Sequence, residues 1–343
     1  MRLLIVFFAV AAALLGAESA IDWRIDPFGS FPKPGAVDAA RSSGCLLSQE
    51  LVGNTYPDYK LTLFRRRRTR VFVIGSSRTV KISAHPGEST FTNMGIPNIS
   101  PAVLLQVLRA IARSSGRPLT MYLGVEAFWF NPSFRGPPPN RWFDKLRYLL
   151  SGNTFRESLL RIRRAPWELT RPWRRDVIGG RCVIGRTNVS IAWRLDGSRL
   201  YGYELAPHLY HPQDLPFTRD LEQLDLGYYA GFDSLSRARL RQLVAALDLA
   251  RQRGWRVVGF TPPNPTRYVQ FLRTNPAVGP QWRAFSRLMP RLFHDRGFAW
   301  LGLGDVRSVP CAQNAFADGG FHANAACSAT IRRRLDAAVR AER

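Results

Sequence analysis

The sequence has little lysine, few acidic residues and only five histidines. Of its 49 basic residues only Lys33, Lys60, Lys81 and Lys145 are lysines, against 25 acidic residues, and the formal net charge is +24. Such a bias to arginine is as typical of a GC-rich genome as of selection for a partner. It nevertheless predicts attraction to acidic polysaccharide or to an anionic envelope surface, because an arginine keeps its charge.

The sequence also lacks any long apolar run after its first twenty residues. Met1-Arg2 is followed by the apolar run from Leu3 to Gly16 and then by Ala17-Glu18-Ser19-Ala20. A positive residue, a short apolar region and small residues are typical of a secretory signal, which we place at 1–20. Because the cleavage site is loose, retention as a membrane anchor is the alternative. We therefore expect an exported protein, either periplasmic or anchored to the outer face of the inner membrane, and no nucleic-acid partner.

No Cys-x-x-Cys pair is present, which disfavours a metal site, and we expect neither a metal nor a cofactor. The four cysteines allow three disulfide pairings, with free thiols as a further alternative. We favour the pairs Cys311 with Cys327 and Cys45 with Cys182, the first of which closes a short loop.

What is present is the composition of a globular protein, with 45% hydrophobic and 22% charged residues. We expect one α/β domain over 21–343, irregular from Ile21 to about Lys60 and interrupted by an insertion at about 132–231. Strands and helices alternate outside the insertion, which predicts a parallel sheet. The expected strands are 71–74, 119–125, 257–261 and 298–303, and the expected helices are 101–114, 235–253, 281–296 and 323–340.

Polar residues follow the first and last of these strands. Gly75-Ser76-Ser77-Arg78 comes after the first, and Asp318-Gly319-Gly320-Phe321-His322 precedes the final helix. Because ligands bind at the carboxyl ends of parallel strands, both segments are expected at one edge of the sheet. A serine hydroxyl becomes nucleophilic when an imidazole takes its proton and a carboxylate orients that imidazole. The sequence therefore predicts a catalytic triad of Ser77, Asp318 and His322.

The segments Val71 to Arg78, Asn93-Met94-Gly95, Gly124 to Asn131 and Asp318 to His322 together resemble the SGNH/GDSL hydrolase superfamily. They are most similar to its branch of envelope proteins that includes D-alanine-transfer and alginate O-acetylation proteins. The resemblance implies a flavodoxin-like three-layer fold, with Ser77 as the nucleophile and no cofactor. It also implies an oxyanion hole formed by the Gly95 and Ser77 amides, which would hold the charge that develops on the carbonyl oxygen.

The sequence departs from that family in two places. The family's third block has an oxyanion-donating Asn, but Gly124-Val125-Glu126-Ala127 has none at that place, and Asn131 or Asn93 is the possible substitute. The spacing from Asp318 to His322 is one residue longer than usual, which a Gly-Gly bulge could absorb. Arg78 is expected either to bind an anionic substrate or to pair with a nearby acid.

These features predict an exported esterase or O-acyltransferase that acts on a cell-surface or secreted polysaccharide through a Ser77 acyl-enzyme. A membrane-embedded protein that donates the acyl group is a possible partner. The alternative is a non-catalytic SGNH-like protein that binds or assembles exopolysaccharide during its biosynthesis or export.

Overall fold

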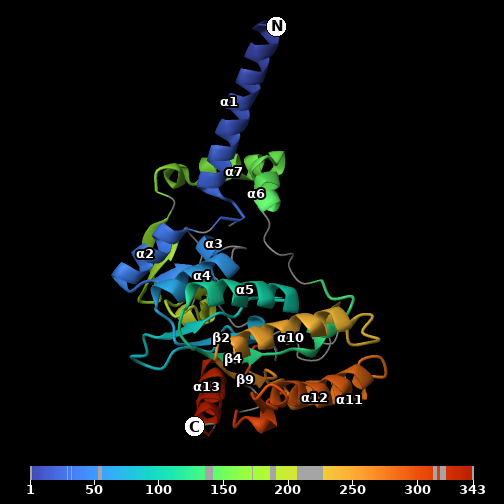
Figure 1. Cartoon of the computed structure of the whole chain (residues 1–343). Helices are drawn as coiled ribbons and strands as arrows, with labels where there is room; N and C mark the ends of the chain where they lie inside the picture. The colour runs from blue at the N-terminus through green and yellow to red at the C-terminus, as the bar shows by residue number, and fades with distance from the viewer. Residues whose placement is uncertain are drawn as a thin grey trace. The chain divides into compact units, whose positions relative to one another are not determined.

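The computed structural model describes residues 2–28, 30–31, 33–52, 56–135, 142–171, 173–185, 191–206, 227–311, 315–316 and 322–341 (Figure 1). The chain forms two compact units. Unit 1 takes in Met1–Tyr59, Asn140–Leu195 and Tyr201–Leu209, and unit 2 takes in Lys60–Pro139, Asp196–Leu200 and Tyr210–Arg343. The N-terminal segment and much of the expected insertion therefore belong to one unit, built from stretches far apart in the sequence.

Unit 1 begins with the long helix α1 (Arg2–Ile25). Of the helices in the part of the chain that the structure describes, α1 is the one long and apolar enough to cross a membrane, over Leu3–Ile25. The side chains of its apolar run are exposed, including Leu3, Phe7 and Leu14. An apolar helix without protein around it fits a membrane span or a signal sequence.

Short helices and strands complete unit 1. The helices are α2 (Pro34–Ser43), α3 (Gln49–Val52), α6 (Trp142–Leu149), α7 (Gly152–Arg164) and α8 (Gly202–Leu205), with the 3-10 turn η3 (Pro166–Leu169). The strands β5 (Arg174–Ile178), β6 (Arg181–Gly185), β1 (Leu46–Ser48) and β7 (Ile191–Trp193) are neighbours in that order. Gly179 and Gly180, both with positive φ, make the two-residue turn between β5 and β6.

Unit 2 contains the parallel sheet that the alternating pattern predicts. Its strand order is β10 (Ala299–Leu301), β9 (Arg256–Phe260), β4 (Thr120–Gly124), β2 (Val71–Ile74) and β3 (Phe91–Asn93), and every neighbouring pair is parallel. Both faces of these strands are apolar, which is typical of a sheet covered by helices on two sides. The short strand β8 (Arg199–Tyr201) lies where the two units divide.

Side chains that alternate along the strands separate the two faces of this sheet. Val73, Tyr122 and Val258 are in register and belong to one buried cluster with residues of α13 (Ala325–Ala341). On the opposite face, Phe72 packs against Phe64 of α4 (Tyr56–Arg66). The remaining helices are α5 (Pro101–Ser114) and α10 (Arg237–Gln252), which run side by side in Figure 1, and α11 (Thr266–Thr274) and α12 (Gly279–His294).

Helix α13 is held to the sheet by a polar network as well as by apolar packing. Asp336 accepts hydrogen bonds from Tyr122 Oη (2.6 Å) and Arg332 Nε (3.0 Å) and lies 2.7 Å from His85 Nε2. Burial alone would raise the pKa of Asp336, but the hydrogen bonds from His85 and Tyr122 and the charge of Arg332 lower it overall. The carboxylate therefore stays ionised and keeps this network together at neutral pH.

Local patterns place several elements correctly. The helix predicted over 101–114 is α5, and the Ser100 side chain accepts a hydrogen bond from Val103 N (3.4 Å), as expected of an N-cap. The prediction of an irregular 21–60 segment is wrong, because α2, α3, β1 and the start of α4 occupy most of its described residues. Its turn signals mark the ends of short elements rather than a continuous loop.

The cysteines form two disulfides, the same pairs that the sequence favours. Cys45 is bonded to Cys182 within unit 1, and Cys311 is bonded to Cys327 within unit 2. The first joins residues 137 positions apart and so holds together two of the three stretches of unit 1.

Gly259 of β9 allows α12 to pack directly on the sheet, and its replacement by Ala should destabilise the protein. An added Cβ would lie 2.2 Å from Cε1 of the buried Phe293. We expect the free energy of unfolding to fall by about 1–3 kcal/mol, the usual cost of overpacking, in urea titrations followed by tryptophan fluorescence. Gly302→Ala is the control, because nothing lies within 4 Å of its added Cβ. Equal unfolding midpoints for the two variants would contradict the close contact.

Candidate functional site

The parallel sheet changes its winding direction between β2 and β4. From β2 the chain continues to β3 on one side, whereas from β4 it continues to β9 and β10 on the other side. Ligands of such sheets bind in the crevice at the carboxyl ends of the two strands that flank this point. Here those ends lead into Ser76, Ser77 and Arg78 after β2 and into Glu126 after β4.

Buried polar side chains connect these two strand ends. Arg78 Nη1 donates to Glu126 Oε2 at 2.9 Å, and Ser76 Oγ donates to Glu126 Oε1 at 2.7 Å. Arg78 Nη2 also donates to the carbonyl oxygens of Pro262 (3.1 Å) and Pro263, which follow β9. All three side chains are buried, and the Glu126 side chain accepts a hydrogen bond on each of its oxygens.

This network corrects one of the two roles expected for Arg78. Its guanidinium is turned inward and binds Glu126 and two backbone carbonyls, so in this structure it pairs with an acid and is not placed to bind a substrate. The sequence predicted pairing with an acid as one alternative but did not identify Glu126 as that acid. The signal that could have found it is a glutamate at the end of an apolar strand, where an unpaired carboxylate would be costly.

Ser77 has a different environment from its neighbours. It begins the 3-10 turn η1 (Ser77–Thr79), and the Ser76 side chain caps this turn by accepting from Arg78 N at 3.2 Å. Ser76, Arg78 and Thr79 are buried, whereas Ser77 is half-buried. The structure therefore presents Ser77, of the residues in this turn, toward the surface.

The backbone amide of Gly95, a predicted oxyanion donor, is already engaged. Gly95 N donates to Asn93 Oδ1 at 2.8 Å, and Asn93 Nδ2 donates to the carbonyls of Thr79 (2.8 Å) and Ile82 (2.7 Å). Asn93 thus ties the loop after β3 to the turn after β2. The buried Lys60 adds a further tie, because its Nζ donates to the carbonyls of Asn93 (2.9 Å) and Gly197.

Asn131, which the sequence offers as a substitute oxyanion donor, is also engaged. Its Nδ2 donates to the carbonyls of Tyr228 (2.8 Å) and Ala230 (3.0 Å), and its Oδ1 accepts from Ser133 N (3.0 Å). An amide nitrogen has two hydrogens, so both donors are used. In this structure Asn131 joins the turn η2 (Ala127–Phe130) to residues 228–230 and is not placed as an oxyanion donor.

His322 precedes α13 (Ala325–Ala341) in the sequence. Arg332, farther along α13, lies over the ring of Phe91, the first residue of β3, at 4.0 Å from the ring centroid. This contact places the middle of α13 beside the start of β3. His322 is half-buried, and Asp318 lies outside the described residues.

The structure presents a half-buried serine after β2 and a half-buried histidine, His322, in the segment before α13. Among the residues that the structure describes, no group of three or more His, Cys, Asp or Glu side chains is placed to hold a metal ion. Comparisons of the chain with protein-family models, with curated proteins and with solved structures find no match. Function is therefore inferred from the chemistry of these residues.

Removal of Arg78 should destabilise the protein strongly. In Arg78→Met the carboxylate of Glu126 stays buried without its cation, which typically costs about 3–5 kcal/mol of unfolding free energy. The double variant with Glu126→Leu should recover most of this loss, because no buried charge remains.

Unfolding titrations of the two single variants and the double variant measure the coupling. Arg307→Met is the matched control, because Arg307 pairs with Asp305 at 2.8 Å on the surface and its loss should change stability little. A double variant less stable than Arg78→Met would show that the pair is not the reason for the loss.

Proposed function

We propose that this protein is an exported SGNH-like protein that hydrolyses or transfers an acyl ester on an envelope polysaccharide, with Ser77 as the nucleophile. The observation that carries the proposal is the exposure of Ser77 at the point where the sheet changes direction, while Ser76, Arg78 and Thr79 around it are buried. A nucleophile must be accessible to its substrate, and ligands of parallel sheets bind at the carboxyl ends of the strands where the sheet changes direction, which is where Ser77 lies.

The strand order supports the proposed fold. Numbered by their order in the chain from β2, the five parallel strands are arranged 2-1-3-4-5 across the sheet. This is the order of flavodoxin-like sheets, and helices lie against both faces. The same order is what the SGNH resemblance of Ser77, Gly95 and His322 implies.

In the proposed reaction His322 takes the proton of Ser77 Oγ as that oxygen attacks the carbonyl carbon of an acyl ester. The ester C–O bond breaks, the alcohol leaves with the proton from His322, and the acyl group stays on Ser77. Water then completes hydrolysis, or a sugar hydroxyl completes transfer. Asp318 has the role of holding the imidazole in the correct tautomer.

A second candidate function is binding or assembly of exopolysaccharide without catalysis. It is favoured by the donors around the site, because the amides of Gly95 and Asn131 are both engaged within the protein. Glu126 adds a carboxylate near the place where a developing oxyanion needs donors, and a carboxylate only accepts. For catalysis, Gly95 N has to give up its hydrogen bond to Asn93 Oδ1 and donate to the substrate oxygen instead.

The proposal includes a location outside the cytoplasm, with α1 retained as a membrane anchor. The helix runs without a break through Ala17–Ala20, and Ser19 Oγ donates to Leu149 O at 3.4 Å. A signal peptidase cuts an extended segment, whereas Ala17–Ala20 is helical and Ser19 within it is bonded to α6. The two disulfides agree with an oxidising compartment.

Replacement of Ser77 by Ala should abolish activity without loss of stability. We expect purified wild-type protein to hydrolyse a small acetyl ester and to be labelled at Ser77 by a fluorophosphonate, as shown by peptide mass mapping. Ser77→Ala should reduce turnover by several orders of magnitude, because the members of a triad act together.

Ser76→Ala separates chemistry from folding. Ser76 is buried and hydrogen-bonded to Glu126, so this variant should lose about 1–3 kcal/mol of stability yet keep the label on Ser77. Absence of label and turnover in folded wild-type protein would support the non-catalytic function instead. Equal loss of activity in both variants would show that the nucleophile is misassigned.

Export and anchoring are tested with reporter fusions at the C-terminus of the whole chain. Alkaline phosphatase should be active and a fluorescent protein that folds only in the cytoplasm should be dark, because long domains are translocated largely regardless of flanking charge. The protein should stay with membranes after carbonate extraction and keep Met1-Arg2 in its intact mass. A dark phosphatase reporter would exclude export, and a soluble mature form that begins near Ala20 would exclude the anchor.

A further inference from the structure

The apolar run at the start of α1 is shorter than the hydrocarbon core of a bilayer, although α1 as a whole, from Leu3 to Ile25, is long enough to cross it. This run, from Leu3 to Gly16, has 14 residues, which is about 21 Å of helix, whereas the hydrocarbon core is about 30 Å thick. From Ser19 to Ile25 the helix has protein beside it. The length that the apolar run leaves uncovered, which we call the missing length, therefore falls on the part of α1 that has protein beside it.

The protein around the end of α1 consists of α6, α7 and η3, which we call the collar. Asp22 of α1 accepts a hydrogen bond from Ser158 of α7 at 2.7 Å, and Arg24 donates to the carbonyls of Leu169 (2.9 Å) and Thr170 (2.8 Å). Together with the hydrogen bond from Ser19 to Leu149, these contacts hold the collar against the C-terminal turns of α1, from Ser19 to Arg24. All of these residues belong to unit 1.

The collar has the surface of a protein that lies in a membrane interface. Its exposed leucines are Leu146 (41%), Leu150 (47%), Leu159 (46%) and Leu169 (41%). Its exposed arginines are Arg147, Arg156, Arg163 and Arg164. Exposed apolar side chains among cations are typical of helices that sink about 5–10 Å into the headgroup region, which matches the missing length of α1.

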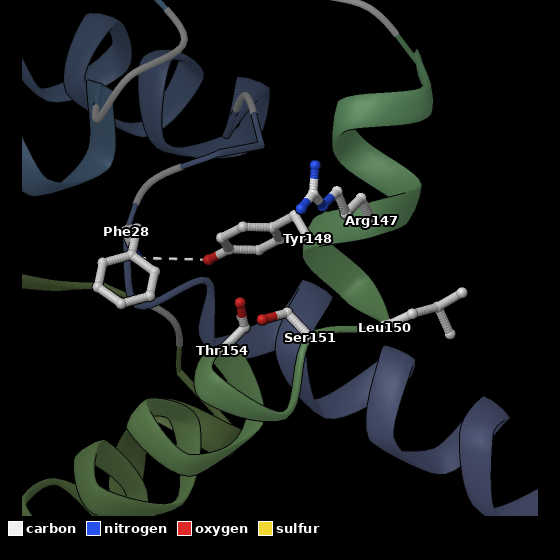
Figure 2. A pocket seen from close by; sticks show the side chains of 6 residues that line it. All are labelled: Phe28, Arg147, Tyr148, Leu150, Ser151 and Thr154. Atoms are coloured by element: carbon white, nitrogen blue, oxygen red, sulfur yellow. Dashed lines mark hydrogen bonds between the residues drawn. The ribbon is translucent and has the colours of Figure 1, made fainter.

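A pocket of about 490 Å³ opens in the collar, lined by Phe28, Arg147, Tyr148, Leu150, Ser151 and Thr154 (Figure 2). Ser151 and Thr154 lie at the start of α7, where first-turn N–H groups and the helix dipole favour an anion. Figure 2 shows their hydroxyls beside the Tyr148 ring, whereas Leu150 points away from them. The pocket thus combines a cation, hydroxyl groups and an apolar wall.

We propose that the collar lies in the outer interface of the membrane that α1 crosses, and that this pocket binds the phosphate headgroup of an anionic phospholipid. The proposal rests on the anchoring of α1 proposed above. Arg147 supplies the charge, Ser151 and Thr154 supply donors, and Leu150 contacts the acyl chains. A phospholipid fits because a free anion would make no use of the exposed leucines around the pocket.

Asp26, which accepts a hydrogen bond from the pocket residue Tyr148, does not oppose this binding. Asp26 accepts from Tyr148 Oη at 2.9 Å and from the amides of Ser30 (2.6 Å) and Phe31 (2.9 Å), and it lies 3.6 Å from Lys33 Nζ. Burial and the charge of Asp26 raise the pKa of Tyr148, so its hydroxyl stays neutral. The negative charge of Asp26 is therefore compensated within the protein.

The depth of the collar is measured with spin labels on the full chain in nanodiscs of phosphatidylcholine with phosphatidylglycerol. Labels at Leu150→Cys and Leu159→Cys should collide more with oxygen, which is lipid-soluble, than with a water-soluble nickel complex. Val177→Cys on β5 is the control, because Val177 is apolar and 74% exposed but outside the collar, and its label should report water.

A label at Phe8→Cys on α1 reports the anchor independently. If the label at Phe8 reports lipid but the labels at Leu150 and Leu159 report water, the proposed position of the collar is wrong and α1 is still an anchor. Water contact at Phe8 overturns the anchor, and the collar with it.

The pocket is tested by the lipid that stays with the protein after extraction from the same nanodiscs, measured by native mass spectrometry. Wild-type protein should keep phosphatidylglycerol in preference to phosphatidylcholine. Arg147→Gln should lower the retained phosphatidylglycerol about fivefold, the effect of one surface arginine. Arg41→Gln, on the exposed side of α2, should change nothing. Equal retention of both lipids, or equal effects of the two variants, overturns the headgroup site.

Discussion

The buried ion pair of Arg78 and Glu126 determines how the edge of the parallel sheet is built. It joins the segments that follow β2 and β4, and the hydrogen bonds of Arg78 to Pro262 and Pro263 add the segment that follows β9. Two charges out of water need hydrogen-bond partners within the protein, since neither is solvated there. The same pair fixes Ser76, which shares Glu126, and thereby sets the turn that presents Ser77.

The two neighbouring serines, Ser76 and Ser77, have different environments in this arrangement. The Ser76 hydroxyl is buried and hydrogen-bonded to Glu126, whereas Ser77 is half-buried and faces the surface. A catalytic site of this type needs hydrogen-bond donors for an oxyanion, but Glu126 near the site is an acceptor. The nearby donors are already used, because Gly95 N bonds to Asn93 Oδ1 and Asn131 Nδ2 bonds to the carbonyls of Tyr228 and Ala230. The acyl transfer proposed here therefore needs a local rearrangement at Gly95, in addition to His322 and Asp318 in their proposed roles.

Local signals in the sequence predicted a substantial part of unit 2. Apolar periodicity and the Ser100 cap define α5, and continuous apolar runs define β2, β4 and β9, because both depend on neighbours along the chain. The strand β3 was missed since three residues give no pattern. Arg78 was left with two alternatives because its partner Glu126 is 48 residues away and Pro262 is 184 residues away. Unit 1 was not foreseen for the same reason, as three separate stretches of chain build it.

The two disulfides connect the expected export to both surfaces proposed here. Cys45–Cys182 closes a loop between stretches of unit 1, the unit that surrounds the end of α1. Cys311–Cys327 closes a shorter loop that includes Asp318 and His322. A crosslink removes conformational freedom that the chain would otherwise have to lose on folding, and the longer loop gains more. In the proposed export, the oxidising compartment is where both crosslinks form, one within unit 1 and one around the segment that carries His322.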